Sequence, residues 1–176
     1  AEGLYAQDAN PIMSLFAEEG IRALAQGLPK IVSSPGDIAA RSKCLYGAWL
    51  CGAVLGNVGM ALQHKLCHTL GGTYNLPHAE THTVVLPHAL AYNAPAVPEA
   101  IDRIARALGV GDAARGMFDL AASLGAPTAL KDIGMPEGQL DWCAEIATQN
   151  AYANPRPIEK AAIRALLEDA YHGKRP

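Results

Sequence analysis

Five of the six histidines of the chain lie between residues 57 and 93, and four of them form two pairs with a spacing of four residues: His64 with His68, and His78 with His82. On a helix, residues four apart stand one turn apart on the same face. A neutral imidazole is the commonest metal ligand in proteins, and two on one helix face can reach one zinc or iron ion. The spacing therefore predicts a site for a metal ion or for proton transfer.

The two pairs are separated by a turn at Gly71-Gly72, so together they could close a four-histidine metal site. The alternative is that these histidines are solvated surface groups. We expect His78 in the first turn of its helix, just after Pro77, where unpaired backbone N–H groups would bind a carboxylate. Lys65 could add positive charge beside the first pair, or be simply solvated. The segment predicts a pocket that combines metal or proton chemistry with carboxylate binding.

The segment before the first pair is apolar enough to suggest a membrane span. Between residues 45 and 62, Asn57 is the only polar residue apart from the tips of the aromatic side chains. Four glycines are spread along this segment, and glycine is costly in a helix unless something packs closely against the backbone. We interpret the segment as a central helix of a soluble protein, buried on all sides, that runs on through His64 and His68 and ends at Gly71-Gly72.

The other segments show helical periodicity with recognisable ends. Asn10-Pro11 predicts the start of an amphipathic helix over Ile12 to about Leu28, with Ile12, Leu15, Phe16 and Ala23 on its apolar face and an end before Pro29. A second helix opens near Pro77 and ends by Asn93. Four further helices are indicated over residues 97–108, 113–124, 140–147 and from Pro157 to Gly173. Because no run of alternating β-branched residues occurs, we predict an all-α, antiparallel helical bundle.

Composition excludes several classes of partner. A net charge of −3 and a pI near 6.1 give no electrostatic attraction to nucleic acid or to anionic membranes. The four cysteines have no CxxC spacing, which favours reduced thiols and a cytoplasmic location, and no signal peptide is recognisable. Nucleotide-binding G-x-G-x-x-G and nucleophile-elbow G-x-S-x-G motifs are both missing from the sequence. The opening AEGLYAQ reads like the second half of a helix, so we expect a fragment of a longer protein.

The stretch from His64 to His78, HKLCHTLGGTYNLPH, and its continuation to VLPH at His88 resemble the signature of the iron-containing (group III) alcohol dehydrogenase superfamily, which has the dehydroquinate synthase-like fold. Within that superfamily, the segments LPHAETH, ALAYNAP, KDIGMPE and ANPRP resemble the maleylacetate reductase branch. These segments cover most of the chain, which makes the resemblance specific.

The resemblance implies that residues 1–176 form the C-terminal helical domain of an enzyme whose N-terminal, dinucleotide-binding α/β domain is missing here. The implied reaction is the reduction of maleylacetate, a small dicarboxylate, to 3-oxoadipate with NADH or NADPH, by a homodimeric enzyme. We expect the chain alone to be inactive, because half of the cleft and the residues that bind the cofactor would be absent. Two alternatives are a metal-dependent (Fe or Zn) alcohol dehydrogenase of the same superfamily and a non-enzymatic helical metal-binding module.

The resemblance also implies roles for individual residues. His64 and His78 match two metal-ligand histidines of the superfamily, and the other two ligands, in a D-x-x-x-H stretch, would precede Ala1. His68 matches a third histidine near the nicotinamide and is the candidate for proton transfer. Maleylacetate reductases often depart from the acidic metal ligand, so the resemblance leaves the presence of iron or zinc open. One turn beyond His78, His82 is the expected contact for a substrate carboxylate, together with Lys65.

Overall fold

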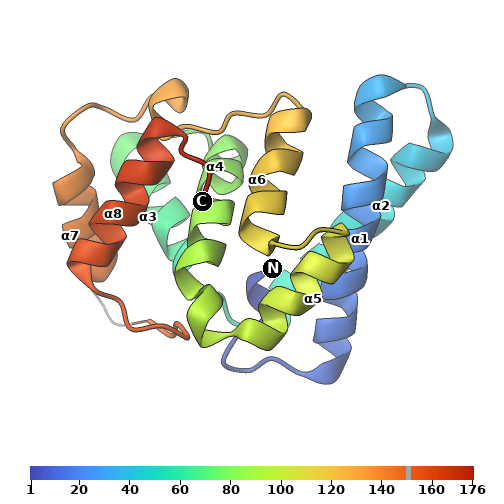
Figure 1. The fold of residues 1–176 in the computed structure, drawn as a ribbon, viewed down its shortest axis with the longest axis horizontal. Coiled ribbons are helices and arrows are strands. Elements are labelled where there is room, and N and C mark those ends of the chain that lie inside the picture. Colours follow the sequence, from blue (N-terminus) through green and yellow to red (C-terminus); the bar gives the residue numbers. More distant parts are fainter. Residues whose placement is uncertain (150–151) are drawn as a thin grey trace.

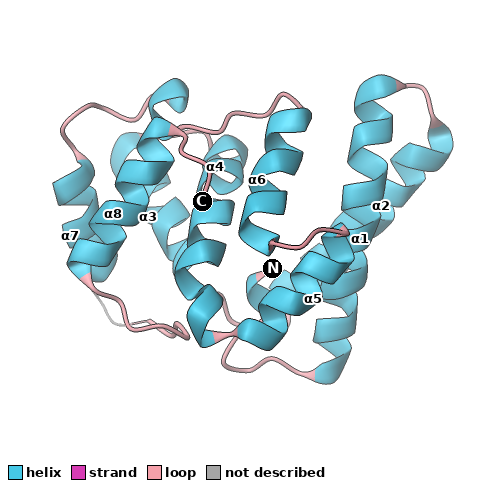
Figure 2. Ribbon diagram, viewed as in Figure 1, coloured by secondary structure: helices cyan, strands magenta, loops and turns pink. Residues whose placement is uncertain are grey.

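A computed structural model describes residues 1–149 and 152–176, and these residues contain helices and loops but no strand (Figures 1 and 2). The elements in chain order are η1 (Glu2–Leu4), α1 (Pro11–Ser33), α2 (Ile38–Leu55), α3 (Leu62–Tyr74), α4 (His78–Asn93), η2 (Ala94–Ala96), α5 (Pro98–Leu108), α6 (Ala113–Ser123), η3 (Leu130–Ile133), α7 (Leu140–Thr148) and α8 (Lys160–His172). The predicted all-α fold is confirmed.

The central helix of the molecule is α4, which lies between two hydrophobic clusters (Figure 1). On one side, Val84, Val85 and Ala89 pack into a cluster formed with α3, α7 and α8. On the other side, Leu90 joins a cluster formed by η1, α1, α5, α6 and the end of α2. Because both sides of α4 are covered, its apolar residues do not form a single stripe, and its N-terminal turn is held at a defined place between the two halves of the core.

The prediction of one helix from residue 45 to Gly71 is wrong, because the chain breaks between Leu55 and Leu62. Gly56 caps α2, and the side-chain amide of Asn57 donates a hydrogen bond to the carbonyl of Ala53 at 2.8 Å, which ends the helix. The backbone N–H of Gly59 then donates to the Asp8 carboxylate at 2.8 Å, which fixes the connection. These contacts turn the chain, so that α3 runs in a different direction from α2.

The expected stop at Gly71-Gly72 is also wrong, since α3 continues for two more residues to Tyr74. Asn75 ends the helix in the left-handed conformation, with φ of 53°, and its N–H donates to the carbonyl of Gly71. Asparagine is one of the few residues besides glycine that adopts this conformation readily. Neither glycine breaks the helix, because the left-handed residue that closes it comes three positions later.

The prediction that the glycine-rich helix is buried on all sides is wrong as well. Helix α2 pairs with α1 in a hairpin that projects from one end of the molecule (Figure 1). Its large apolar side chains point outward, with Trp49 63% exposed and Leu45 72% exposed, while Gly47 and Leu50 face α1. No helix in the described ranges combines the length and hydropathy needed to cross a membrane.

Helix α1 is longer than predicted and contains Pro29 in its interior. It packs along α2 as far as Gly27, where a Cβ atom would meet Cys44 and the carbonyl of Ala40, so α2 supports α1 up to the turn before the proline. The expected apolar face is partly correct, since Ala23 is buried and Phe16 packs against a hydrophobic cluster. Ile12 and Leu15 are exposed, and the buried positions are mainly small residues, namely Ser14, Ala17, Gly20, Ile21, Ala23 and Gly27.

Most of the later helix ends agree with the predictions. Helix α4 begins at His78 and ends at Asn93, and Gly109 and Gly173 cap α5 and α8. However, α8 begins at Lys160 and not at Pro157. The carbonyl of Pro157 accepts a hydrogen bond from the Tyr92 hydroxyl at 2.6 Å, so this part of the chain is a loop bound to α4. The buried face of α8 accordingly consists of Ile163, Leu166, Leu167 and Ala170.

The close approach of α1 and α2 yields a stability prediction. A Cβ atom at Gly47 would lie 2.9 Å from Cγ of Leu24 and 3.0 Å from the carbonyl oxygen of Gly20, so Gly47→Ala should lower the free energy of unfolding by about 1–3 kcal/mol. Gly52→Ala on the same helix is the control, because a Cβ there meets nothing within 4 Å. The control should be neutral or stabilising by about 0.5–1 kcal/mol. Equal effects of the two changes in urea unfolding would contradict this packing.

Candidate functional site

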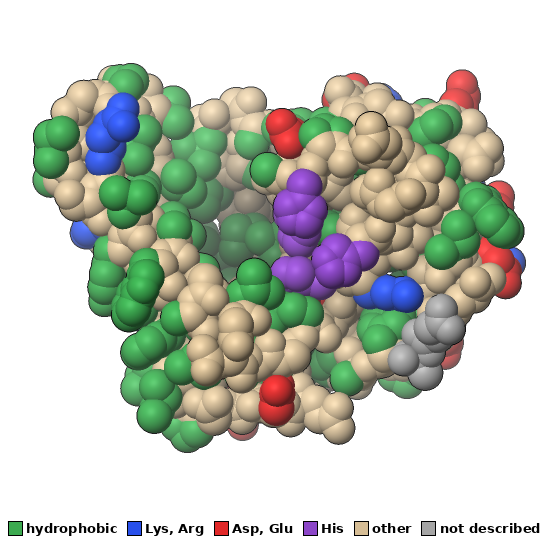
Figure 3. Space-filling model, turned by 180° about the vertical axis from the view of Figure 1, so that it is seen from behind, with side chains coloured by type: hydrophobic (Ala, Val, Ile, Leu, Met, Phe, Trp, Pro, Cys, Tyr) green, Lys and Arg blue, Asp and Glu red, His purple; other side chains and the backbone are tan. Residues whose placement is uncertain are grey.

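Helices α3 and α4 bring the four predicted histidines together on one face of the molecule (Figure 3). The ring centroids of His68 and His64 are 6.3 Å apart, those of His64 and His82 are 4.9 Å apart, and those of His82 and His78 are 4.4 Å apart. The rings therefore form a row in the order 68, 64, 82, 78. His68 and His78, at the two ends of the row, are exposed, and the two inner rings are partly buried. We call this row the histidine face.

The start of α3 is fixed by a buried carboxylate from the beginning of the chain. Glu2 is 2% exposed, and it accepts the backbone N–H of Gln63 at 2.6 Å and that of His64 at 3.3 Å. The N–H of Leu62 donates to the side-chain oxygen of Asn154 at 3.3 Å. The first N–H groups of a helix have no partner inside the helix, and the positive end of the helix dipole favours a negative charge. Glu2 and Asn154 thus cap α3 from distant parts of the chain.

The same carboxylate orients the ring of His64, whose Nδ1 lies 2.6 Å from Oε2 of Glu2. Burial by itself would raise the pKa of Glu2, but the hydrogen bonds from the His64 ring and from the backbone N–H of Gln63 outweigh it and lower the pKa. An ionised carboxylate only accepts hydrogen bonds, so Nδ1 of His64 carries the proton and donates it. In the neutral ring, Nε2 of His64 is then the nitrogen with a free lone pair.

The histidine face has some, but not all, of the features of a metal site. A metal-ligating histidine usually donates its second ring N–H to a carboxylate, as His64 does to Glu2, so His64 fits the role of a ligand. His78 is exposed at the start of α4 and is free to turn toward a shared ion. In residues 1–149 and 152–176, however, no three His, Cys, Asp or Glu side chains are grouped so that they could hold a metal. The closed four-histidine site considered from the sequence is not formed in this part of the chain.

His82 lies in the middle of the row and is neutral. The pKa of His82 is lowered to about 4. Burial of the ring is the largest cause, and the positive charge that His64, His78 and His68 can carry adds to it. Nδ1 of His82 is 2.9 Å from Nε2 of Gln63. The other ring nitrogen of His82, Nε2, is buried without a hydrogen-bond partner among the described residues.

Lys65, the second expected carboxylate contact, lies near the histidine face but not within it. Its Nζ atom is 5.5 Å from the ring centroid of Tyr152, close enough for a cation–π interaction. Figure 3 shows a basic side chain directly beside the histidines. The positive charge of Lys65 thus lies next to the histidine face, although the side chain extends toward the loop that contains Tyr152.

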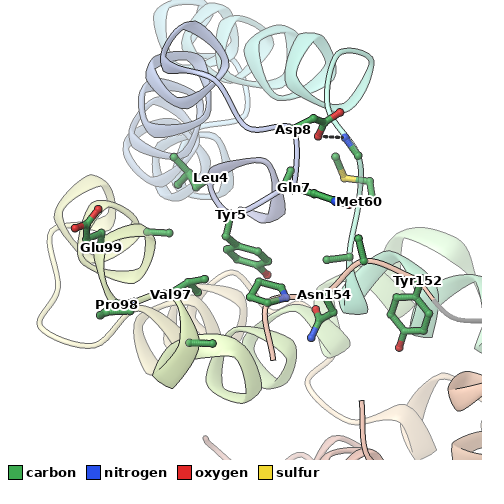
Figure 4. A pocket seen from close by; sticks show the side chains of 17 residues that line it. Leu4, Tyr5, Gln7, Asp8, Met60, Val97, Pro98, Glu99, Tyr152 and Asn154 are labelled. Atoms are coloured by element: carbon green, nitrogen blue, oxygen red, sulfur yellow. Dashed lines mark hydrogen bonds between the residues drawn. The ribbon is translucent and has the colours of Figure 1, made fainter. Parts of the chain in front are cut away.

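Two cavities adjoin α3, and the larger one is not at the histidines. It has a volume of about 890 Å³ and is lined by residues that include Tyr5, Asp8, Met60, Val97 and Asn154 (Figure 4). A smaller cavity of about 260 Å³ is lined by Glu2, Gln63 and His64 together with residues of α1 and α2. The titratable groups that can do chemistry gather at the smaller cavity and at the histidine face, so we place the candidate site there.

Sequence reasoning missed three residues that build this site, namely Glu2, Gln63 and Asn154. Glu2 and Asn154 lie far from the histidines in the sequence, and although Asn154 belongs to the ANPRP segment, that segment does not indicate a contact with α3, so the role of both residues is visible only in the fold. Gln63 directly precedes His64, but a lone glutamine before a histidine gives no signal of its own.

Residues 1–171 match the model of the Fe-containing alcohol dehydrogenase family, C-terminal part. The chain is 60% identical over 176 residues to the maleylacetate reductase of Burkholderia cepacia, which covers 100% of the chain and 50% of that protein. Among solved structures, the chain matches the maleylacetate reductase of Agrobacterium tumefaciens with a TM-score of 0.97 and 56% identity, over 100% of the chain and 50% of that protein.

The match to an iron-containing alcohol dehydrogenase of Corynebacterium glutamicum has a TM-score of 0.93 and 44% identity, over 98% of the chain and 49% of that protein. The chain thus spans about half the length of each of the three relatives, and it has the fold of the corresponding half.

A buried histidine, His88, and a partly buried one, His82, yield a prediction about acid stability. His88 is 4% exposed, and its Nε2 has no hydrogen-bond partner in the described part of the chain. Burial lowers the pKa of His88 to about 4, and the pKa of His82 is lowered to the same value. Because the unfolded chain binds these protons more readily, stability is fully present above pH 6.5 and is lost as the pH falls from 6.5 through 4. For His88 alone we expect a loss on the order of 2–3 kcal/mol.

Urea unfolding measured between pH 7.5 and roughly pH 4 tests this expectation. His88→Leu should flatten the decline, whereas His172→Gln, which changes an exposed histidine at the end of α8, should leave it in place. A pH profile of His88→Leu as steep as that of the unchanged protein would contradict the assignment.

Proposed function

The chain belongs to the Fe-containing alcohol dehydrogenase family, and on that basis we propose that it is the C-terminal helical domain of an NAD(P)H-dependent maleylacetate reductase. The observation that carries the proposal is the similarity to maleylacetate reductases over the full length of the chain. The proposed enzyme is cytoplasmic and homodimeric, and a dinucleotide-binding α/β domain precedes the described helices. The chain alone supplies one side of the cleft and is inactive by itself.

The proposed reaction saturates the carbon–carbon double bond conjugated with the ketone of maleylacetate. When bound, NADH or NADPH would supply the hydride, with both electrons, for one alkene carbon; a proton added to the other carbon would complete 3-oxoadipate and leave the oxidised cofactor. The helical domain then has two tasks, which are to hold a dianionic substrate and to deliver a proton. The histidine face offers groups for both.

His68 is the proposed proton donor, because it is exposed at the end of the row and its ring can meet a substrate held against the face. His82 and Lys65 are the proposed contacts for the substrate carboxylates. A neutral imidazole N–H and an ammonium group can both donate hydrogen bonds to a carboxylate, and the ammonium also adds positive charge. Lys65 and His68 lie on α3 and His82 lies on α4, with the ring of His64 between those of His68 and His82.

His64 and His78 are the proposed ligands if an iron or zinc ion is bound in the complete protein. A bound ion would polarise a substrate oxygen as a Lewis acid. In this chain, Glu2 keeps Nε2 of His64 free of a proton, as ligation requires. The histidines would need further ligands from the missing domain, because the described residues supply no third donor in reach.

A metal-dependent alcohol dehydrogenase of the same family is the second candidate, and the similarity to the iron-containing alcohol dehydrogenase of Corynebacterium glutamicum is the observation that favours it. The two candidates differ in substrate. Stoichiometric iron or zinc with reduction of simple aldehydes, and no turnover of maleylacetate, would establish the alcohol dehydrogenase instead.

Removal of His68 is the direct test of the proposed function. The complete protein should oxidise NADH or NADPH when maleylacetate is added, and His68→Ala should lower kcat roughly 10²- to 10⁴-fold, the usual contribution of a general acid. The melting temperature should change little, because His68 is exposed. His172→Ala, at an exposed histidine of α8, is the matched control and should keep full activity. Normal turnover by His68→Ala would remove the role assigned to it.

Metal removal separates the enzyme from a non-enzymatic metal-binding module. In a module built around a structural metal, the 176-residue chain would fold cooperatively only with the metal and would unfold with a chelator. We expect the opposite, because two hydrophobic clusters and the Glu2 cap hold the helices together. Thermal unfolding of the chain followed by circular dichroism should be the same with and without EDTA, and unfolding by EDTA alone would favour the module.

A further inference from the structure

We propose that Gln63 is a positioning residue that holds His82 in the tautomer with its proton on Nε2, while Glu2 anchors Gln63 and holds His64 in the opposite tautomer. The consequence for substrate binding rests on the proposed function. Gln63 is buried at 6% exposure at the start of α3, between Glu2 and His82. None of the sequence patterns at the histidines includes it.

The orientation of the Gln63 amide follows from its two neighbours. Its Nε2 is 2.9 Å from Nδ1 of His82 and 3.4 Å from the carbonyl oxygen of the same residue. A backbone carbonyl can only accept a hydrogen bond, so the amide nitrogen, and not the amide oxygen, must face His82. The amide N–H therefore donates to Nδ1 as well. Since Nδ1 accepts, the proton of the neutral His82 ring is on Nε2.

The side chain of Gln63 is buried, and its backbone is fixed by the same carboxylate that fixes His64. The N–H of Gln63 donates to Oε1 of Glu2 at 2.6 Å, and the ring of His64 donates from Nδ1 to Oε2 at 2.6 Å. One buried carboxylate thus organises both inner histidines of the row. It orients the ring of His64 directly and that of His82 through Gln63.

The result is a pair of neighbouring imidazoles, 4.9 Å apart between centroids, with complementary chemistry. Nε2 of His64 offers a lone pair, and Nε2 of His82 offers an N–H. In the described residues this N–H has no partner, and a buried donor without an acceptor is costly. An oxygen that only accepts, such as a carboxylate or a ketone oxygen, would satisfy it. An alcohol can also accept, but it would bring no negative charge for Lys65.

Nitrogen NMR of the complete protein, with ¹⁵N label only in histidine and with His82→Ala to assign the signals, tests the tautomer without relying on activity. In the unchanged protein, Nδ1 of His82 should be the unprotonated nitrogen. Gln63→Leu should give a mixture of tautomers, and Gln63→Glu, which places an acceptor against the ring, should move the proton to Nδ1. A protonated Nδ1 in the unchanged protein would overturn the inference.

Kinetics test the consequence for substrate binding. Gln63→Leu and Gln63→Glu should raise KM for maleylacetate by roughly 10- to 100-fold while leaving KM for the dinucleotide unchanged. Gln63→Asn keeps the amide on a shorter side chain and should recover part of the loss. Gln26→Leu is the matched control, because Gln26 is exposed on α1 and bonds to Lys43. It should behave as the unchanged protein.

The outcomes separate this inference from the proposed function. If the unchanged protein does not reduce maleylacetate, the proposed function fails, and the NMR measurement still decides the tautomer. If the protein is active but KM stays constant in variants whose His82 tautomer has changed, the positioning role of Gln63 is overturned and the reductase remains.

Discussion

The candidate site depends on one buried carboxylate. No side chain within α3 or directly before it caps the helix, and its first backbone N–H groups are bonded instead by Glu2 and Asn154, from opposite ends of the chain. Because these bonds join distant segments, the place and tilt of α3 are set by tertiary structure and not by local sequence. The negative charge of Glu2 is favourable at the positive end of the helix. Without it, the backbone N–H groups of Gln63 and His64 and the ring N–H of His64 would lose their acceptor.

The position of α4 supplies the other half of the site. Its two sides are packed into separate hydrophobic clusters, so the helix cannot rotate without disturbing both. Rigid placement of α4 holds His82 against His64 and leaves His78 open at the first turn. Burial in this setting keeps His82 neutral, which an acceptor-binding imidazole requires. The same two helices therefore determine both the geometry of the histidine face and the protonation of His82.

Part of this account could be predicted from the sequence. The spacing of the histidines correctly indicated two helices that share a face, and the caps at Pro77, Gly109 and Gly173 located helix ends well. The apolar run around Trp49 was misjudged, because the hydrophobicity of a segment does not show which of its residues face the neighbouring helix. Here the glycines of α2 serve a tight contact with α1, and the large apolar side chains point away from it.

The contacts of Glu2 and Gln63 could not be predicted, because neither residue shares a periodic pattern or a motif with the histidines. A carboxylate that caps a helix 61 positions away is recognised only when the fold places it there. The resemblance to a known family implied roles for single histidines, whereas the hydrogen bonds explain why the adjacent imidazoles of His64 and His82 can adopt different tautomers. The roles and the hydrogen bonds are linked, because the hydrogen-bond partner of one ring nitrogen decides whether the other nitrogen of a neutral histidine carries the proton.

A crystal structure of the complete protein with oxidised cofactor and 3-oxoadipate would test the central claim most directly, because it locates the dicarboxylate relative to the histidine face. We expect one carboxylate within hydrogen-bonding distance of Nε2 of His82, the carbon chain beside His68, and Gln63 still bonded to Nδ1 of His82. A dicarboxylate bound instead in the larger cavity lined by Tyr5 and Asn154, with the histidine face in contact with solvent alone, would contradict the account.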